Sequence, residues 1–344
     1  MSARSLADQR PIRSRGLRLL ILAVVIFAVV AAPSSATFPG VNGLISFNAY
    51  VERTKSFEIF TATRNGGDVR KLTFNPNHNS VLPDWSPDGQ RIAFQSDRVD
   101  VDGRKNAVQT YLMNADGSGL TQLTRGPGFQ GAPGWSPDAA NLAIDADWGG
   151  GPGLQGIWVI PASDPDGVVV SEARRLTTIP ARAKFDSEPQ FSPDGRSIVF
   201  TRFRSLSVSA IHRVSIDGTG LDRLTPWRLN ASDPDWSPNG LKITFDSGDA
   251  GKAGSKGDIY VMRADGNGRK VLTDHPRLRK GEPFDLANNP VWSPSGTKIM
   301  YSHFLPEKTV LEVMKPNGSG KHLVVGGRFG RKHFPNKVDW GTHP

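Results

Sequence analysis

Short runs of alternating hydrophobic and polar residues fill most of the chain, and one run recurs five times. The clearest copy reads PDWSPDGQRIAF, and the five copies begin at Pro83, Pro133, Pro189, Pro234 and Pro290. Each copy has an aromatic residue, then a turn containing proline, then two apolar residues separated by one position. Alternation with period two puts both apolar side chains on the same face of a strand. The repeat therefore predicts short β-strands joined by tight turns.

Each repeat of about 50 residues predicts four strands. The first strand holds the aromatic residue, the second holds the apolar pair, the third begins near a large apolar residue, and the fourth closes on a Leu-Thr pair such as Leu72-Thr73. The aromatic residues are Trp85, Trp135, Phe191, Trp236, Trp292 and Trp340. Because they recur once per repeat, we interpret them as packing residues between neighbouring repeats rather than as a stacking cage for a ligand.

The first and last repeats are incomplete in complementary ways. The repeat from Gly43 lacks an aromatic first strand, while the segment around Trp340 supplies one with nothing after it. If that segment completes the first repeat, six sheets close into a ring and no sheet edge is left to end the array. The sequence therefore predicts an all-β six-bladed β-propeller with four-stranded blades, in which the C-terminal strand completes the first blade. An open stack of sheets, the alternative, would not explain the split repeat.

The recurring WSPDG-x-x-I-x-F, the NADGSG turn and the Leu-Thr pair resemble the repeats of the TolB-like, WD-repeat-like β-propeller family. They are also similar to the propellers of prolyl oligopeptidase-type proteins. The resemblance covers roughly residues 43–341 and implies a propeller that docks a peptide in its tunnel, as TolB-like relatives do with lipoproteins. TolB-like proteins carry an α/β domain before the propeller, and the peptidases carry a hydrolase domain with a G-x-S-x-G nucleophile. We expect neither domain here, and therefore no peptidase activity.

The first 36 residues differ from the repeats. Five arginines and one aspartate precede the apolar run Leu19–Ala32, and small residues at Ser34 and Ala36 suit cleavage after Ala36. This order is typical of a secretory signal helix, and a run of 14 residues is short for a membrane span. We expect a signal peptide over 1–36 and a single propeller domain over 37–344. The alternative is that the N-terminal segment is retained as a membrane anchor.

Charge and cysteine content narrow the function classes. The chain has 42 Lys+Arg against 33 Asp+Glu, a formal net charge of +9. The N-terminal segment accounts for four of these charges. Basic residues on the outer strands, where charge discourages edge-to-edge pairing, account for the rest, so the basicity does not indicate a nucleic-acid partner. The absence of cysteine excludes disulfides, cysteine-based zinc sites and thiol nucleophiles. We expect an exported monomer, periplasmic, cell-surface or secreted, that touches a membrane only through an uncleaved N-terminal segment.

Three aspartates precede ring aromatics and are candidate tunnel residues, because first strands form the inner edge of a propeller. They are Asp84 in blade two, Asp235 in blade five and Asp339 in blade one. Carboxylate oxygens suit hard cations, so one hypothesis is a hydrated Ca²⁺ or Mg²⁺ in the tunnel. The alternative is that each aspartate accepts a local hydrogen bond near its turn. We expect no other cofactor.

The connections between repeats should surround one mouth of the tunnel, and they carry charged and imidazole groups. The candidate ligand-binding residues at this mouth are His78, Arg182, Asp186, Arg228, Arg279, Arg331 and His333. Such a set favours an anionic ligand. The alternative is ordinary solvated loop charge.

These observations predict a non-catalytic exported propeller that binds a protein or cell-envelope ligand through one face or the central tunnel. The seven histidines form no short metal-binding spacing, and no catalytic motif occurs. The alternative is a glycan-active hydrolase or lyase with its site at the tunnel mouth. Propellers assemble sites from residues scattered over several blades, and such a site leaves no linear motif.

Overall fold

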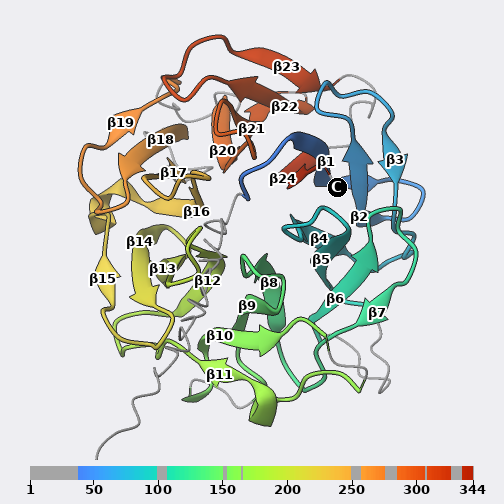
Figure 1. Cartoon of the computed structure of the whole chain (residues 1–344), viewed down its shortest axis with the longest axis vertical. Coiled ribbons are helices and arrows are strands. Elements are labelled where there is room, and N and C mark those ends of the chain that lie inside the picture. The colour runs from blue at the N-terminus through green and yellow to red at the C-terminus, as the bar shows by residue number, and fades with distance from the viewer. Residues whose placement is uncertain are drawn as a thin grey trace, which may run out of the picture. The chain divides into compact units, whose positions relative to one another are not determined.

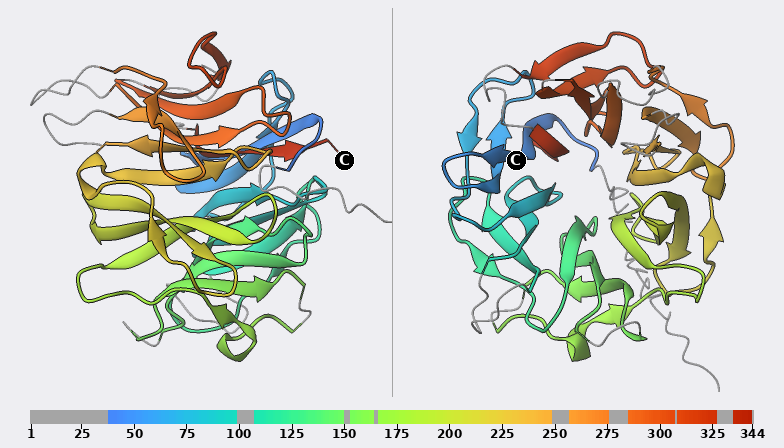
Figure 2. Two further views of the ribbon diagram at one scale, coloured as in Figure 1. Left: turned by 60° about the vertical axis from the view of Figure 1, so that its left-hand side comes forward. Right: turned by 180° about the vertical axis from the view of Figure 1, so that it is seen from behind.

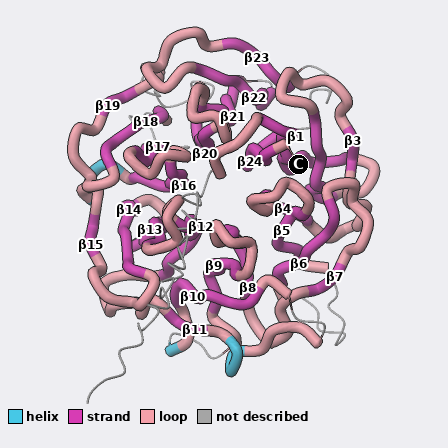
Figure 3. Tube along the Cα trace, in the orientation of Figure 1, coloured by secondary structure: helices cyan, strands magenta, loops and turns pink. Residues whose placement is uncertain are grey.

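The computed structural model describes residues 38–98, 107–149, 153–163, 166–248, 257–275, 285–306, 308–326 and 335–343. The expected signal helix in residues 1–36 lies outside these ranges. Within them, no helix is long and apolar enough to cross a membrane. Two short 3-10 turns, η2 (Val170–Glu172) and η3 (Trp227–Leu229), interrupt an otherwise all-β fold (Figure 3).

The described residues form six antiparallel sheets of four strands each, arranged as blades around a central tunnel (Figure 1). From the inner edge outward, blade one is β24 (Pro335–Thr342), β1 (Asn42–Val51), β2 (Ser56–Ala62) and β3 (Arg70–Lys71). Blade two is β4 (Ser80–Trp85), β5 (Arg91–Ser96), β6 (Gln109–Asn114) and β7 (Thr121–Gln122). Blade three is β8 (Gln130–Trp135), β9 (Asn141–Ala146), β10 (Gly156–Pro161) and β11 (Arg174–Arg175).

The other three blades follow the same order. Blade four is β12 (Phe185–Phe191), β13 (Ser197–Ser205), β14 (Val208–Ser215) and β15 (Asp222–Arg223). Blade five is β16 (Ala231–Trp236), β17 (Lys242–Ser247), β18 (Asp258–Arg263) and β19 (Lys270–Val271). Blade six is β20 (Leu286–Trp292), β21 (Ile299–Leu305), β22 (Lys308–Met314) and β23 (His322–Val325).

Blade one joins the two ends of the propeller, as the split repeat predicts. β24 pairs antiparallel with β1, and Trp340 lies opposite Ile45. Seen from behind, β24 lies beside β1 at the inner edge of the blade (Figure 2). The closed six-bladed propeller is confirmed.

The repeated Ser-Pro-Asp-Gly turn forms because its side chains bond its own backbone. In blade two the Ser86 hydroxyl donates to Asp88 Oδ1 at 2.6 Å and accepts the Arg91 N–H at 2.9 Å. Gly89 has φ of +67°, a conformation that glycine adopts without steric cost. The same Ser and Asp pairing recurs at Ser136–Asp138 and Ser192–Asp194. These bonds hold the turn between the first and second strands of these blades.

The outer strands are shorter than the sequence suggests, because the Leu-Thr pair follows the strand instead of ending it. The threonine hydroxyl takes over the pairing: Thr73 Oγ1 accepts the Ile59 N–H at 2.9 Å. Equivalent bonds join Thr124 to Thr110, Thr177 to Ile157, Thr225 to Ile211 and Thr273 to Ile259. A side chain thus continues the ladder where the backbone strand has stopped.

The core consists of six apolar clusters, and each lies between two neighbouring blades. Trp135 of blade three packs in one cluster with Ala93 of blade two, and Trp236 of blade five packs with Val199 of blade four. All six ring aromatics are at most 4% exposed. Their interpretation as packing residues between repeats is confirmed.

Replacing Trp340 by alanine should destabilise the propeller by about 3–5 kcal/mol, because it leaves a cavity at the seam that closes the ring. Urea denaturation monitored by tryptophan fluorescence measures the change. Leu206→Ala, at a side chain that is 86% exposed, is the control and should change stability by less than about 0.5 kcal/mol. Equal stability of the Trp340 variant and the parent chain would contradict a closed ring.

Candidate functional site

Every inner strand carries one residue with left-handed backbone at the same position. These residues are Lys337 (φ 45°), Leu82 (56°), Ala132 (44°), Glu188 (57°), Asp233 (51°) and Asn289 (51°). In blades two to six the next residue is a proline and the strand register shifts there, which marks a β-bulge. Proline cannot donate to a ladder and is tolerated at bulges. Left-handed non-glycine residues are strained and cluster at ligand sites, so this ring is the first candidate for function.

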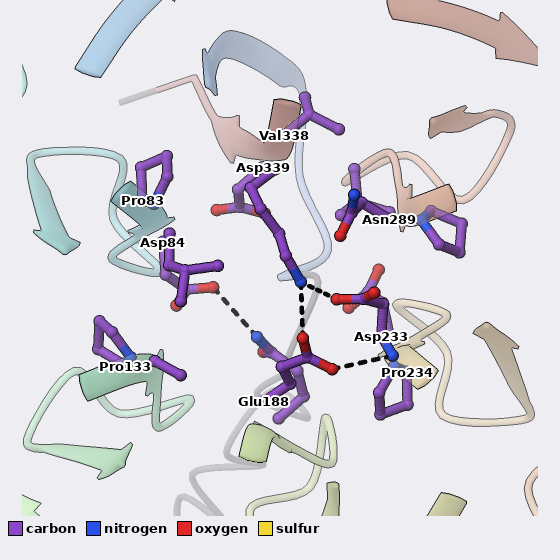
Figure 4. Close-up of a pocket in the computed structure, with 16 residues that line it drawn as sticks. Pro83, Asp84, Pro133, Glu188, Asp233, Pro234, Asn289, Val338 and Asp339 are labelled. Carbon is purple, nitrogen blue, oxygen red and sulfur yellow. Dashed lines mark hydrogen bonds and ion pairs between the residues drawn. The ribbon is translucent and has the colours of Figure 1, made fainter. Parts of the chain in front are cut away.

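The ring lines a central cavity that, with the open solvent at its mouth, has about 570 Å³ of space not filled by protein atoms. Inner strands of all six blades contribute side chains to its wall. Figure 4 shows Asp84, Glu188 and Asp233 projecting into this space from three different blades. One part of the wall is charged, while Leu82, Ala132 and several prolines make another part apolar.

An ion-pair network crosses the tunnel. The Lys337 amine of blade one donates to Glu188 Oε1 of blade four at 2.8 Å and also to Asp233 Oδ1 of blade five. Glu188 Oε2 in turn accepts the Asp233 N–H at 3.1 Å and the Thr201 hydroxyl at 3.0 Å. The side chains of Lys337, Glu188 and Asp233 are 16–22% exposed. The network is therefore shielded from bulk water but open to a ligand in the tunnel.

The three predicted aspartates line the same cavity, and each bonds the next blade. Asp84 Oδ2 accepts the Trp135 N–H at 2.9 Å. In the same way, Asp339 Oδ2 accepts the Trp85 N–H at 2.7 Å, and Asp235 Oδ2 accepts the Trp292 N–H at 2.7 Å. The alternative hypothesis was that each aspartate accepts a local hydrogen bond near its own turn. The observed bonds differ from that hypothesis, because donor and acceptor belong to neighbouring blades. Each carboxylate ties one inner strand to the aromatic residue of the next.

Burial changes the acidity of this ring. Desolvation raises the pKa of Asp339 to about 6. Desolvation, together with the nearby Asp339 charge, holds the pKa of Asp84 well above its usual range. Within the described ranges, the three aspartates do not form a group with oxygens all within 4.8 Å of one another. A cation here would be held partly through water, and the hydrated-cation hypothesis stays a prediction.

The residues predicted at the tunnel mouth have different surroundings. Asp186 is buried and makes a bidentate ion pair with Arg202, at 2.6 and 2.7 Å. Its carboxylate also accepts the Thr177 hydroxyl, so it is held by the fold and has no oxygen turned to solvent. His78 is half-exposed, with Nδ1 2.9 Å from the Asp97 carbonyl. Arg182 and Arg228 are exposed.

Arg279, Arg331 and His333, the remaining mouth candidates, lie outside the described residues. Their place at the mouth, and the anionic ligand they favour, stay predictions.

Sequence reasoning missed Glu188, Asp233 and Lys337, because these positions vary from blade to blade. The available signal was the recurring proline that follows the position in five blades, which marks a bulge. It also missed a cluster of His275, Asp285 and His303, whose ligating atoms all lie within 4.8 Å of one another. Burial alone would lower the pKa of His303, but hydrogen bonds to Glu312 and Asp285 outweigh it and raise that pKa. These three residues are too far apart along the chain to form a recognisable metal-binding motif.

Comparisons with known proteins agree with the fold. A family profile described as the TolB beta propeller domain matches residues 157–336. An uncharacterized protein of Agrobacterium fabrum is 31% identical over 227 residues, which cover 64% of this chain and 69% of that protein. The Tol-Pal system protein TolB of Bordetella pertussis is 29% identical over 183 residues, which cover 52% of this chain and 37% of that protein. The match therefore spans little more than a third of that relative's length.

A solved structure of TolB from Acinetobacter baumannii superposes with a TM-score of 0.68 at 19% identity, covering 88% of this chain and 67% of that one. At this identity the superposition shows the shared fold alone.

Asp145 of β9 lies behind the tunnel wall and provides a test of its burial. The Ser187 hydroxyl donates to Asp145 Oδ2 at 2.6 Å, and Oδ1 has no hydrogen-bond partner among the described residues. Desolvation, with a smaller contribution from the Glu188 charge, raises the pKa of Asp145 to about 7. The folded protein therefore holds this proton in a range where the unfolded chain has lost it.

Stability should consequently fall as the pH rises from about 4 to about 7, and level off above that, because only the unfolded chain ionises Asp145 within this window. The stability of the Asp145→Asn variant should lack the pH dependence that comes from this carboxyl group. The difference in unfolding free energy between parent and variant should change by about 3–4 kcal/mol across the window. Urea denaturation at several pH values measures it, and parallel pH profiles of the two proteins would refute the buried neutral acid.

The hydrated-cation hypothesis predicts that millimolar CaCl₂ or MgCl₂ raises the melting temperature by about 3 °C or more. Asp84→Asn should reduce this shift, because an amide cannot ionise to hold the cation but keeps an oxygen to accept the Trp135 N–H. Differential scanning fluorimetry is the measurement. No shift with either cation would end the hypothesis.

Proposed function

This chain belongs to the TolB beta-propeller family, and from that premise we propose that it is an exported, non-catalytic binding protein that holds a cationic segment of a protein or cell-envelope component in its central tunnel. The observation that supports this proposal is the charge of the tunnel wall. Its lining includes one amine, that of Lys337, against the carboxyl groups of Glu188, Asp233, Asp235 and Asp339. It also includes the Asp84 carboxyl, whose raised pKa favours the protonated form.

The unequal charge makes the tunnel receptive to a cation. Carboxylates in a narrow space with apolar walls create a stronger potential than the same groups in bulk water. Lys337 already occupies the positions that a lysine or arginine of a ligand would take, between Glu188 and Asp233. A ligand amine that displaces the Lys337 amine could donate to both Glu188 and Asp233 without any movement of the backbone.

The family supports a protein partner in the cell envelope. One relative is named as a Tol-Pal system protein, and the N-terminal pattern of this chain is that of an exported protein. We therefore propose that the protein acts in the periplasm, at the cell surface or outside the cell, as a monomer without a nucleic-acid partner. Because the match covers 37% of that relative, the Tol-Pal role itself is not carried over.

Capture from envelope extracts on the immobilised protein tests the proposal. The double variant Glu188→Gln/Asp233→Asn should lose at least tenfold in affinity for the captured partner, and raising the salt concentration should weaken binding to the parent protein. Surface plasmon resonance with the purified partner gives the numbers.

The control is the double variant Asp217→Asn/Asp265→Asn, which changes the charge equally on exposed hairpin turns. Blade six already carries an asparagine at this turn position, and Asn317 Oδ1 accepts the Ser319 N–H there. The control should therefore fold and bind like the parent chain. If the Glu188→Gln/Asp233→Asn variant binds the partner as tightly as the parent chain, the ligand binds an outer face and not the tunnel.

A second candidate is a glycan-active hydrolase or lyase with its site at the tunnel mouth. One observation favours it: His275 and His303 converge with carboxylates near the connection between blades five and six. Turnover of an envelope polysaccharide by the purified protein, lost in His303→Gln, would replace the binding proposal with this one. No turnover across a panel of such glycans would leave the binding proposal standing.

A further inference from the structure

Two histidines and one aspartate meet where blade five connects to blade six. His275 follows β19, Asp285 directly precedes β20, and His303 lies within β21. Asp285 Oδ1 is 2.8 Å from His303 Nε2 and 3.7 Å from His275 Nε2. The two imidazole rings have centroids 5.0 Å apart. Both Nε2 atoms therefore face one carboxylate oxygen.

The other nitrogen of each ring has its own carboxylate. His275 Nδ1 is 3.0 Å from Asp258 Oδ1, and His303 Nδ1 is 3.2 Å from Glu312 Oε2. A carboxylate on Nδ1 fixes the ring orientation and makes Nε2 a better electron-pair donor, the outer-shell arrangement typical of metal-binding histidines. Each Nδ1 thus has a carboxylate oxygen within 3.2 Å, but only the contact between His275 and Asp258 has hydrogen-bond geometry. The two Nε2 atoms point at a common place.

The supporting carboxylates are themselves held in position. Asp258 Oδ1 accepts the Thr273 hydroxyl at 2.9 Å and the His275 N–H at 2.9 Å. Glu312 Oε2 accepts the Tyr301 hydroxyl at 2.6 Å. Such bonds let the imidazoles keep their geometry without a ligand present.

We propose that His275, Asp285 and His303 form a binding site for a divalent transition-metal ion of the zinc class. Two imidazole nitrogens and one carboxylate oxygen suit Zn²⁺, Co²⁺ or Ni²⁺, whereas Ca²⁺ and Mg²⁺ take oxygen ligands. Without a metal ion, His303 Nε2 lies within hydrogen-bonding distance of Asp285, at 2.8 Å. His275 Nε2, at 3.7 Å from the same oxygen, lies outside that distance. A shared metal ion explains why both rings turn the same nitrogen inward.

Exposure fits an accessible site. The side chains of His275 and His303 are 12% and 15% exposed, while that of Asp285 is 39% exposed. The metal would enter past Asp285, and three protein ligands leave a coordination position for water or an oxygen of a bound molecule. The site uses none of the residues that line the tunnel, so it is independent of the proposed cation-binding function.

Isothermal titration of the metal-stripped full chain with ZnCl₂ tests the inference, and Co²⁺ absorption between about 500 and 650 nm reports imidazole coordination. The parent chain should bind one equivalent. Asp285→Asn and His275→Ala should abolish stoichiometric binding, and Glu312→Gln should weaken it by about 10–100-fold, because it removes support but no ligand.

His322→Ala, at an exposed histidine on β23, is the matched control and should bind zinc like the parent. Melting curves without metal show whether each variant is folded, and Asp285→Asn, at a half-exposed side chain, keeps the test decisive if a histidine variant unfolds. No zinc uptake by the parent chain, or uptake unchanged in the folded Asp285 variant, would overturn the proposal. Either result would leave the tunnel experiments unaffected.

Discussion

Each blade of this propeller is a sheet with two apolar faces, so no blade can bury its core alone. Every apolar cluster is shared by two blades, as where Trp236 of blade five packs with Val199 of blade four. The free energy of burial is therefore available only when neighbours stack, and the stack ends without an exposed face only if it closes. The need to cover every apolar face therefore favours a closed ring of blades, and a closed ring encloses a central tunnel. The inner strands then face one another whatever their side chains are.

The tunnel is consequently where blades are free to differ. Every seam has an aromatic residue at the same place, but the bulge residue ahead of it has no packing role that is common to all blades. Blade three has Ala132 there, blade four has Glu188 and blade one has Lys337. Because the six bulges point their residues at one axis, variation that looks random along the chain becomes an arranged set of charges in space.

This contrast explains what could be predicted from the sequence. The fold could be predicted from the repeats, because Trp85 and its counterparts follow one packing rule that recurs six times in the sequence. Asp84, Asp235 and Asp339 were placed in the tunnel because they adjoin those aromatics. The ion pair between Lys337 and Glu188 could not be foreseen, because it joins opposite blades and depends on bulge geometry. His275 and His303 were missed for the same reason, since the fold and not the spacing brings them together.

The pairing of β24 with β1 also has a consequence for the order of folding. Ile45 and its partner Trp340 lie at opposite ends of the propeller sequence. A growing chain can stack blades two to six as they appear, but blade one has no inner strand until the last repeat segment has been made. Closure therefore requires the most distant contact in the fold, and such contacts form late and slowly. An array that has not yet closed leaves one apolar face uncovered at each end, and exposed apolar surface of this kind is prone to aggregation.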